Sequence, residues 1–156
     1  MVAGATDYGV IRNHGRDEPT DIISLCCVAD FDHIKIVDGS LCIGGGATWT
    51  DIENFIQQSI PQYHKILIRF GSPQIRNAGT LAGNLAGGSP IGDSIPFHMV
   101  MDSQLELTGP DGVRTVKLCD FYTGYRQNVM SSGELITEII TPVSYTHLTL
   151  PTTPYV

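Results

Sequence analysis

Residues 70–93 contain six glycines in 24 positions, and this density restricts what the chain can build there. Glycine lets a backbone approach a ligand closely and turn its N–H groups inward. Hydroxyl and amide side chains lie between the glycines, and they suit phosphate oxygens without carrying a charge. These side chains belong to Ser72, Asn77, Thr80, Asn84 and Ser89. The segment therefore predicts a cradle for a pyrophosphate group.

Other interpretations of this segment stay open. It contains no Gly-Lys-Ser/Thr sequence and no dinucleotide fingerprint, so a glycine-rich connector without a ligand is the alternative. Asp93 suits a ribose hydroxyl or a ring N–H as an acceptor, or instead the N-terminal end of a helix before Ile95. Arg76 is either a phosphate contact or a donor that pins the loop.

The charge of the chain excludes one large class of partners. Nine Lys and Arg residues stand against 16 Asp and Glu residues, which gives a net charge of −7, and there is no basic run. Nucleic acid needs clustered cations, so we expect no nucleic-acid partner. No apolar stretch approaches the ~18 residues that span a bilayer, and residues 1–9 lack the pattern of a secretory signal. We therefore expect a cytoplasmic location without membrane association.

The cysteines and histidines show no metal-site spacing. We expect the cysteines to be reduced and half-buried, as in cytosolic proteins, and the histidines to lie on the surface or in loops. The sequence thus predicts no metal site and no iron–sulfur cluster in this chain. The residues concerned are Cys26, Cys27, Cys42 and Cys119, with His14, His33, His64, His98 and His147.

Residues 1–70 predict a loop, a strand, a hairpin and two helices. A turn at Asp38-Gly39 between apolar runs indicates the hairpin. Thr48 and Asp51 can cap each other's backbone N–H groups, so a helix begins there, and we expect Pro61 to end it. The predicted ranges are a loop over 4–9, strands over 20–27, 34–37 and 41–43, and a second helix over 63–70.

Residues 71–142 predict a long loop followed mainly by strands. The loop covers 71–93, a helix covers 96–101, and strands cover 104–108, 113–118 and 135–140. Helices early in the chain and antiparallel strands late indicate an α+β fold rather than a doubly wound parallel sheet.

Several motifs follow one another along residues 2–142 in a characteristic order. Two of them are Gln74-Ile-Arg-Asn-x-Gly-Thr-x-x-Gly-Asn84 and Ser89-Pro-Ile-Gly-Asp93. The others are Ala3-Gly-Ala-Thr-Asp7, Gly44-Gly-Gly-Ala-Thr-Trp-Thr-Asp-Ile-Glu53, Asp120-Phe-Tyr-x-Gly-Tyr-Arg126 and Glu134-Leu-Ile-Thr-Glu138. Together they resemble the FAD-binding domain of the molybdenum hydroxylases, and above all the flavin-carrying small subunit of bacterial xanthine dehydrogenase. The resemblance implies a two-subdomain, PCMH-type fold: a small α/β subdomain plus an antiparallel-sheet subdomain.

The resemblance also implies FAD as the cofactor and assigns binding residues but no catalytic residue. The first loop is expected to meet the nucleotide part of FAD, and the second loop the pyrophosphate and part of the flavin. Phe70 is expected to pack an aromatic ring against the cofactor, Ser89 and Asp93 to supply polar contacts, and Ile136 to line the isoalloxazine ring. The first loop comprises Val2, Ala3, Gly4, Ala5, Thr6, Asp7 and Tyr8, and the second comprises Thr80, Leu81, Ala82, Gly83 and Asn84.

In such enzymes a partner subunit with the molybdenum cofactor oxidises a purine. Electrons pass through 2Fe-2S clusters to FAD and then to NAD. The resemblance therefore implies partner domains or subunits that carry the molybdenum cofactor and the clusters. Two alternatives are a non-redox nucleotide-binding module and an inactive truncated fragment.

Residues 143–156 differ from the rest in being rich in Thr and Pro and free of charge. The ten residues 143–152 resemble the translation of a transposase adapter used in sequencing libraries, which is not part of a natural protein chain. We therefore expect residues 1–142 to form part of an FAD-binding domain, and residues 143–156 to be a non-native tail.

Overall fold

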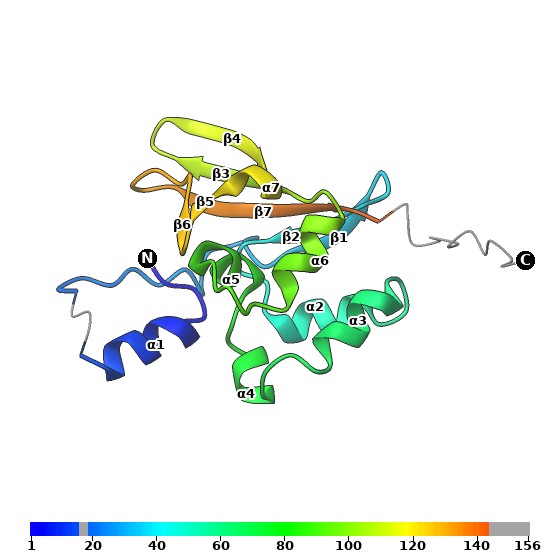
Figure 1. Ribbon diagram of the computed structural model, residues 1–156, viewed down its shortest axis with the longest axis horizontal. Helices are drawn as coiled ribbons and strands as arrows, with labels where there is room; N and C mark the ends of the chain where they lie inside the picture. The colour runs from blue at the N-terminus through cyan, green and yellow to red at the C-terminus, as the bar shows by residue number, and fades with distance from the viewer. Residues whose placement is uncertain (16–18, 144–156) are drawn as a thin grey trace, which may run out of the picture.

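The computed structural model describes residues 1–15 and 19–143, and its centre is a five-stranded antiparallel sheet (Figure 1). The strand order is β1-β2-β7-β3-β4. The strands are β1 (Ile34–Val37), β2 (Ser40–Gly44), β3 (Gln104–Gly109), β4 (Gly112–Lys117) and β7 (Leu135–Pro142). The predicted hairpin and the three predicted later strands are confirmed, and β2 joins them in one sheet by pairing with β7.

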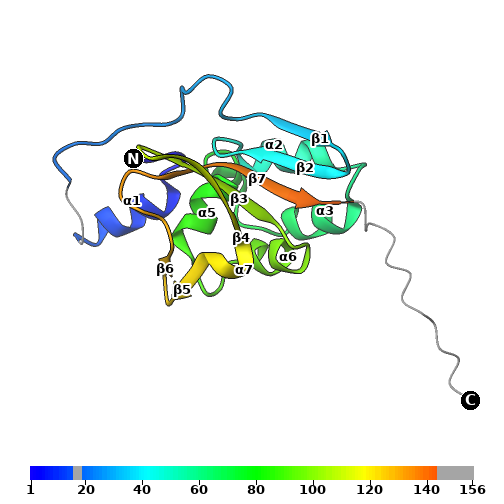
Figure 2. The same cartoon turned by 90° about the horizontal axis from the view of Figure 1, so that it is seen from above.

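Helices cover one face of this sheet, which confirms the α+β prediction (Figures 1 and 2). Four of them, α2, α3, α5 and α6, lie together below the strands in Figure 1. The helices are α1 (Thr6–Asn13), α2 (Trp49–Ile56), α3 (Pro61–Leu67), α4 (Pro73–Arg76), α5 (Leu81–Gly87), α6 (Ser94–Val100) and α7 (Leu118–Phe121). A small ribbon of β5 (Tyr122–Gly124) and β6 (Gln127–Asn128) lies beside α5; the sequence analysis predicted neither this ribbon nor α7.

Local sequence signals explain the hairpin and α2. Asp38 and Gly39 form the tight turn with φ values of 49° and 74°, the left-handed conformation that such turns require. The Thr48 hydroxyl accepts from the Asp51 N–H at 3.2 Å, and the Asp51 carboxylate accepts from the Thr48 N–H at 3.1 Å. The predicted reciprocal cap of α2 is therefore confirmed.

The core lies between the sheet and the helices. Ile43, Ile139 and Leu105 are opposite one another in the register of β2, β7 and β3, and all three are fully buried. Trp49 and Phe121 complete this core from α2 and α7. Each such side chain stabilises the fold by about 1.5–3 kcal/mol relative to exposure.

Two segments predicted as loops contain helices, and those predictions are wrong. Residues 4–9 include the start of α1, and residues 71–93 include α4 and α5. Side-chain hydroxyls cap the beginnings of α4 and α5, since Ser72 accepts from the Ile75 N–H and Thr80 accepts from the Gly83 N–H. Small residues and glycines have weak intrinsic helix preference, so tertiary contacts decide the structure there.

The predicted strand over 20–27 is also wrong. Its only pairing is a single bridge between Val2 and Ser24, and Ile22 and Ile23 are largely exposed. A β-branched sequence becomes a strand when a neighbour pairs with it, and no strand of the sheet pairs with residues 20–27. Consequently Cys26 and Cys27 are both exposed rather than half-buried, as is Cys119, while Cys42 is buried.

Two further predictions need correction. Pro61 does not end α2, which stops at Ile56; it occupies the first turn of α3, where its fixed φ suits a helix start. His98 is not a surface residue, because its side chain is fully buried on α6. The prediction for His147 and most of the predicted tail lie outside the described residues. Val143, the first residue of that tail, is 9% exposed and donates its N–H to the Gly39 carbonyl.

The other predicted helices are confirmed with shifted bounds, as α3 and α6. Within the described residues, no helix is both long and apolar enough to cross a membrane.

Candidate functional site

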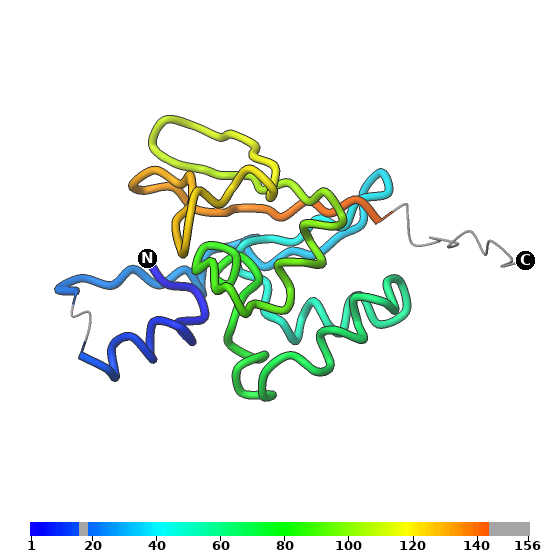
Figure 3. The backbone as a smooth tube through the Cα atoms, viewed as in Figure 1, coloured from blue at the N-terminus to red at the C-terminus, as the bar shows by residue number. Residues whose placement is uncertain are grey.

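The two segments predicted to bind one ligand lie against each other. A methyl group added at Gly4 would collide with the carbonyl of Ala78, so the two backbones touch. A methyl group added at Gly79 would lie 3.3 Å from the Thr6 hydroxyl. Figure 3 shows the N-terminal segment beside the start of α5, although about half of the chain separates them in sequence. The beginnings of α1 and α5 therefore form one continuous surface.

The first turn of α5 carries the second predicted loop. Thr80 is 6% exposed, and its hydroxyl accepts from the Gly83 N–H at 3.1 Å. Leu81 and Ala82 are buried in the core cluster, at 0% and 7% exposed. Gly83 is exposed. N–H groups in a first helical turn have no intrahelical acceptors and favour anions.

The first turn of α1 carries the first predicted loop. Ala5 precedes it with φ 53°, and no side chain caps this helix. The Asp7 carboxylate lies alongside Gly87, where an added methyl group would be 3.4 Å from its Oδ2. Tyr8 Oη is buried and has no hydrogen-bond partner among the described residues. A buried hydroxyl normally finds a partner, so this atom suits an additional polar group.

These features fit an anionic dinucleotide such as FAD. Two helix beginnings converge, and that of α1 has no side-chain cap. Glycine removes side chains where the backbone would approach a ligand, and the buried Tyr8 hydroxyl has no partner among the described residues. Val2 and Ala3 lead into this surface beside the 24–26 segment, since Leu25 N–H donates to Val2 O and Cys26 Sγ–H to Ala3 O. Asn84 Oδ1 accepts from the Ser94 hydroxyl at 2.8 Å, which ties α5 to α6.

Phe70 and Arg76 lie at the other end of the glycine-rich segment. The Phe70 ring is half-buried, with its centroid 4.4 Å from that of Trp49. Arg76 donates to the carbonyls of Phe70 and Gly71 at 3.2 and 3.1 Å and forms an ion pair with Glu53 at 3.0 Å. Of its two interpretations, the structure therefore supports the donor that pins the loop.

Ser89, Asp93 and Ile136 occupy three different settings. Ser89 lines a cavity of about 230 Å³ between the 88–96 segment and the β5–β6 ribbon, which Tyr122 and Arg126 close from the other side. Asp93 is exposed at the N-terminal end of α6, with no side-chain capping bond. Ile136 lies on β7 and is 4% exposed, within the core cluster.

Sequence reasoning missed the residues that hold α5 from outside. Tyr122 Oη donates to the Leu85 carbonyl at 2.9 Å, and Asn128 Nδ2 donates to the Ala86 carbonyl at 3.0 Å. Both come from the unpredicted β5–β6 ribbon. Tyr122 lies within one of the quoted motifs, but no spacing rule pairs it with a helix 37 residues earlier.

Comparison with known proteins gives a consistent result. The family described as "FAD binding domain in molybdopterin dehydrogenase" matches residues 1–144. The nicotinate dehydrogenase FAD-subunit of Eubacterium barkeri is 33% identical over 145 residues, covering 90% of this chain and 49% of that protein. The xanthine dehydrogenase FAD-binding subunit of Escherichia coli O157:H7 is 30% identical over 139 residues, covering 87% of this chain and 48% of that protein.

A solved structure shares the fold. Reconstituted CO dehydrogenase from Oligotropha carboxidovorans contains a chain that superimposes with a TM-score of 0.85 at 29% identity, covering 90% of this chain and 50% of that one. The chain thus spans about half the length of the curated relatives that it matches.

Proposed function

The chain belongs to the family of FAD-binding domains in molybdopterin dehydrogenases, and we propose that it holds FAD at the joined beginnings of α1 and α5 as part of a multi-subunit oxidoreductase. The observation that carries this proposal is the contact of Gly4 with Ala78, which brings the two helix beginnings together. Residues 1–142 form the binding part in this proposal.

The chain's own groups bind and orient the cofactor. Backbone N–H groups of residues 4–8 and of the first turn of α5 donate to the pyrophosphate and neighbouring polar atoms, replacing the cations that this acidic chain lacks in clusters. The N–H groups of Gly83 and Asn84 are the exceptions in that turn, because they already donate to the hydroxyl and carbonyl of Thr80. Ser89 and Asp93 add polar contacts beyond α5. Phe70 and Ile136 supply apolar contacts to the flavin side. When bound, FAD supplies redox chemistry, and no residue of this chain serves as acid or base.

We extend the proposal to the electron path. Electrons enter from iron–sulfur clusters and a molybdenum centre on partner domains or subunits, and they leave to NAD, as in a xanthine dehydrogenase-like enzyme. The names of similar proteins refer to nicotinate, xanthine and carbon monoxide, although the three proteins match 90%, 87% and 80% of this same chain. This supports a partner, rather than this chain, as the determinant of the substrate.

The binding proposal is tested by titrating FAD into the purified chain while following flavin fluorescence, with ADP as competitor. The proposal predicts saturable binding of one FAD per chain and weaker binding of ADP. Equal affinity for ADP and FAD would instead favour a non-redox nucleotide-binding module. Absence of saturable FAD binding would contradict the proposal for this chain.

A further inference from the structure

α5 is unusually poorly equipped to stay helical by itself. It has only seven residues, of sequence Leu-Ala-Gly-Asn-Leu-Ala-Gly. Each glycine in a helix costs about 1 kcal/mol relative to alanine, and isolated helices shorter than ~12 residues are marginal. Yet its first turn, Thr80–Asn84, carries half of the proposed FAD site. Something outside the helix must therefore hold it in place.

Core packing of Leu81, Ala82 and Leu85 holds one side of α5, and the β5–β6 ribbon adds support at the end opposite the first turn (Figure 1). The last carbonyls of a helix lack intrahelical donors. Two of them accept from the ribbon: Leu85 O, which the Gly88 N–H also reaches at 3.2 Å, from the Tyr122 hydroxyl at 2.9 Å, and Ala86 O from the Asn128 amide at 3.0 Å. These two bonds tie the end of α5 to a separate structural unit.

Both donors are themselves fixed in a donating state. Burial raises the pKa of Tyr122 to about 12, so its phenol keeps its proton at neutral pH. Asn128 Oδ1 accepts from Met130 N–H at 3.0 Å, which orients its amide nitrogen toward α5. The Tyr122 ring also lies against Gly88, where an added methyl group would be 3.1 Å from Cε1. The ribbon thus contacts the helix end through two bonds and one ring.

We propose that Tyr122 and Asn128 are positioning residues for the FAD site: by binding the carbonyls of Leu85 and Ala86, they fix the direction in which the first turn of α5 presents its N–H groups. The inference rests on the proposed function, since it concerns the affinity of that same site. Both side chains act on the C-terminal end of α5, opposite its first turn, and Tyr122 also lines the cavity that Ser89 borders.

Two nearly isosteric variants test this inference. Tyr122→Phe removes only the hydroxyl, and Asn128→Asp keeps the Oδ1 acceptor for Met130 while removing the donor to Ala86. Each is expected to weaken FAD binding about fivefold, the effect of one net hydrogen bond, and to speed amide hydrogen exchange in residues 83–88.

Two controls separate positioning from general effects. Gln127→Glu adds the same charge to an exposed neighbour on the ribbon, and Thr108→Val removes a hydrogen bond to Thr137 that is remote from α5. Both are expected to keep wild-type FAD affinity and wild-type exchange in residues 83–88. Unchanged affinity and exchange in Tyr122→Phe and Asn128→Asp would overturn the inference, as would equal losses in the controls. If wild-type chain binds no FAD, the proposed function fails, whereas the exchange measurement still decides whether the ribbon fixes α5.

Discussion

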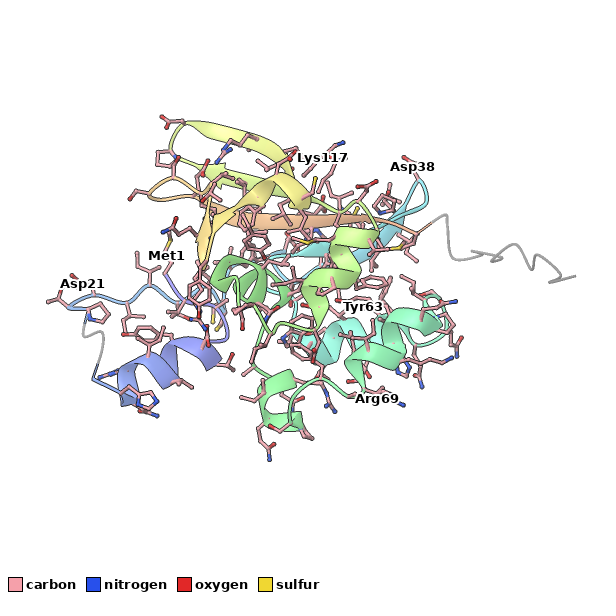
Figure 4. All side chains as sticks on the ribbon, viewed as in Figure 1. Met1, Asp21, Asp38, Tyr63, Arg69 and Lys117 are labelled. Carbon is pink, nitrogen blue, oxygen red and sulfur yellow. The ribbon has the colours of Figure 1, made fainter. Side chains whose placement is uncertain are left out.

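The hydroxyl of Tyr63 lies 2.8 Å from Nε2 of His98, and both side chains are fully buried between α3 and α6. The other ring nitrogen of His98 contacts Thr141 Oγ1 at 3.0 Å and Ser103 Oγ at 3.2 Å. This cluster therefore links two helices with the C-terminal end of β7. Figure 4 shows Tyr63 on the helical side of the sheet.

The first prediction concerns acid sensitivity. Burial lowers the pKa of His98 from 6.5 to about 3, because the charged imidazolium is disfavoured away from water. Between these two values the unfolded chain binds a proton at His98 that the folded chain does not. The free energy of unfolding should therefore fall as pH decreases from 6.5 toward 3.

Denaturant unfolding at several pH values checks this prediction. His98→Asn should be less stable at pH 7 and should show a shallower decrease in stability below pH 6.5. Equal pH dependence in wild type and variant would show that His98 does not cause the acid sensitivity.

A second prediction concerns the opposite end of the sheet. Arg114 donates to Glu134 at 2.7 and 2.8 Å, and Ser131 N–H donates to the same carboxylate at 2.6 Å. The Arg114 hydrogen bonds, together with the Ser131 amide, lower the pKa of Glu134 from 4.5 to about 2. This interaction stabilises the fold above pH 4.5 and is lost as pH falls through 2.

Thermal unfolding of Glu134→Gln checks this second prediction. The variant should melt below wild type at pH 7, and the difference should shrink as pH approaches 2. A difference that stays constant with pH would show that the carboxylate charge is irrelevant.

The sequence predicted best where a local signal needs no distant partner. Asp38-Gly39 specified the hairpin turn, and the Thr48 hydroxyl with the Asp51 carboxylate specified the start of α2. Prediction failed where tertiary contacts decide. α5 is built from weak helix formers and depends on Tyr122 for support, so a loop was the natural expectation.

For the candidate site, too, local signals were informative and tertiary contacts were not foreseen. The glycine-rich composition indicated which segment binds, but nothing in the spacing indicated that Gly4 touches Ala78. Likewise a lone histidine gives no sign that Tyr63, Ser103 and Thr141 will surround it, which is why His98 was expected at the surface.

A third prediction tests the close approach of Gly4 to Ala78. Gly4→Ala forces a methyl group into the Ala78 carbonyl and should lower the free energy of unfolding by about 1–3 kcal/mol, or detach residues 1–15 and expose them to protease. Gly9→Ala is the matched control, because it lies in α1 with open space around it and should stabilise that helix by up to ~1 kcal/mol. Equal behaviour of the two variants would refute the close approach.

A fourth prediction concerns the exposed glycine of α5. A side-chain carbon at Gly83 would meet only the Thr80 hydroxyl, at 3.0 Å, so Gly83→Val should keep the fold, as circular dichroism can verify. It should nevertheless abolish saturable FAD binding by blocking approach to the backbone. Gly9→Ala, whose added methyl group meets nothing within 4 Å, should bind FAD normally. Full flavin content in Gly83→Val would remove this residue from the site.

The most direct test of the account is to follow the backbone amide resonances of the chain during an FAD titration. We predict that the largest shifts appear together in residues 4–8 and 80–84, at one FAD per chain. Residues on the far side of the sheet, such as Lys117, should stay unchanged. Shifts confined to one of the two segments, or concentrated elsewhere, would contradict a site formed by the joined beginnings of α1 and α5.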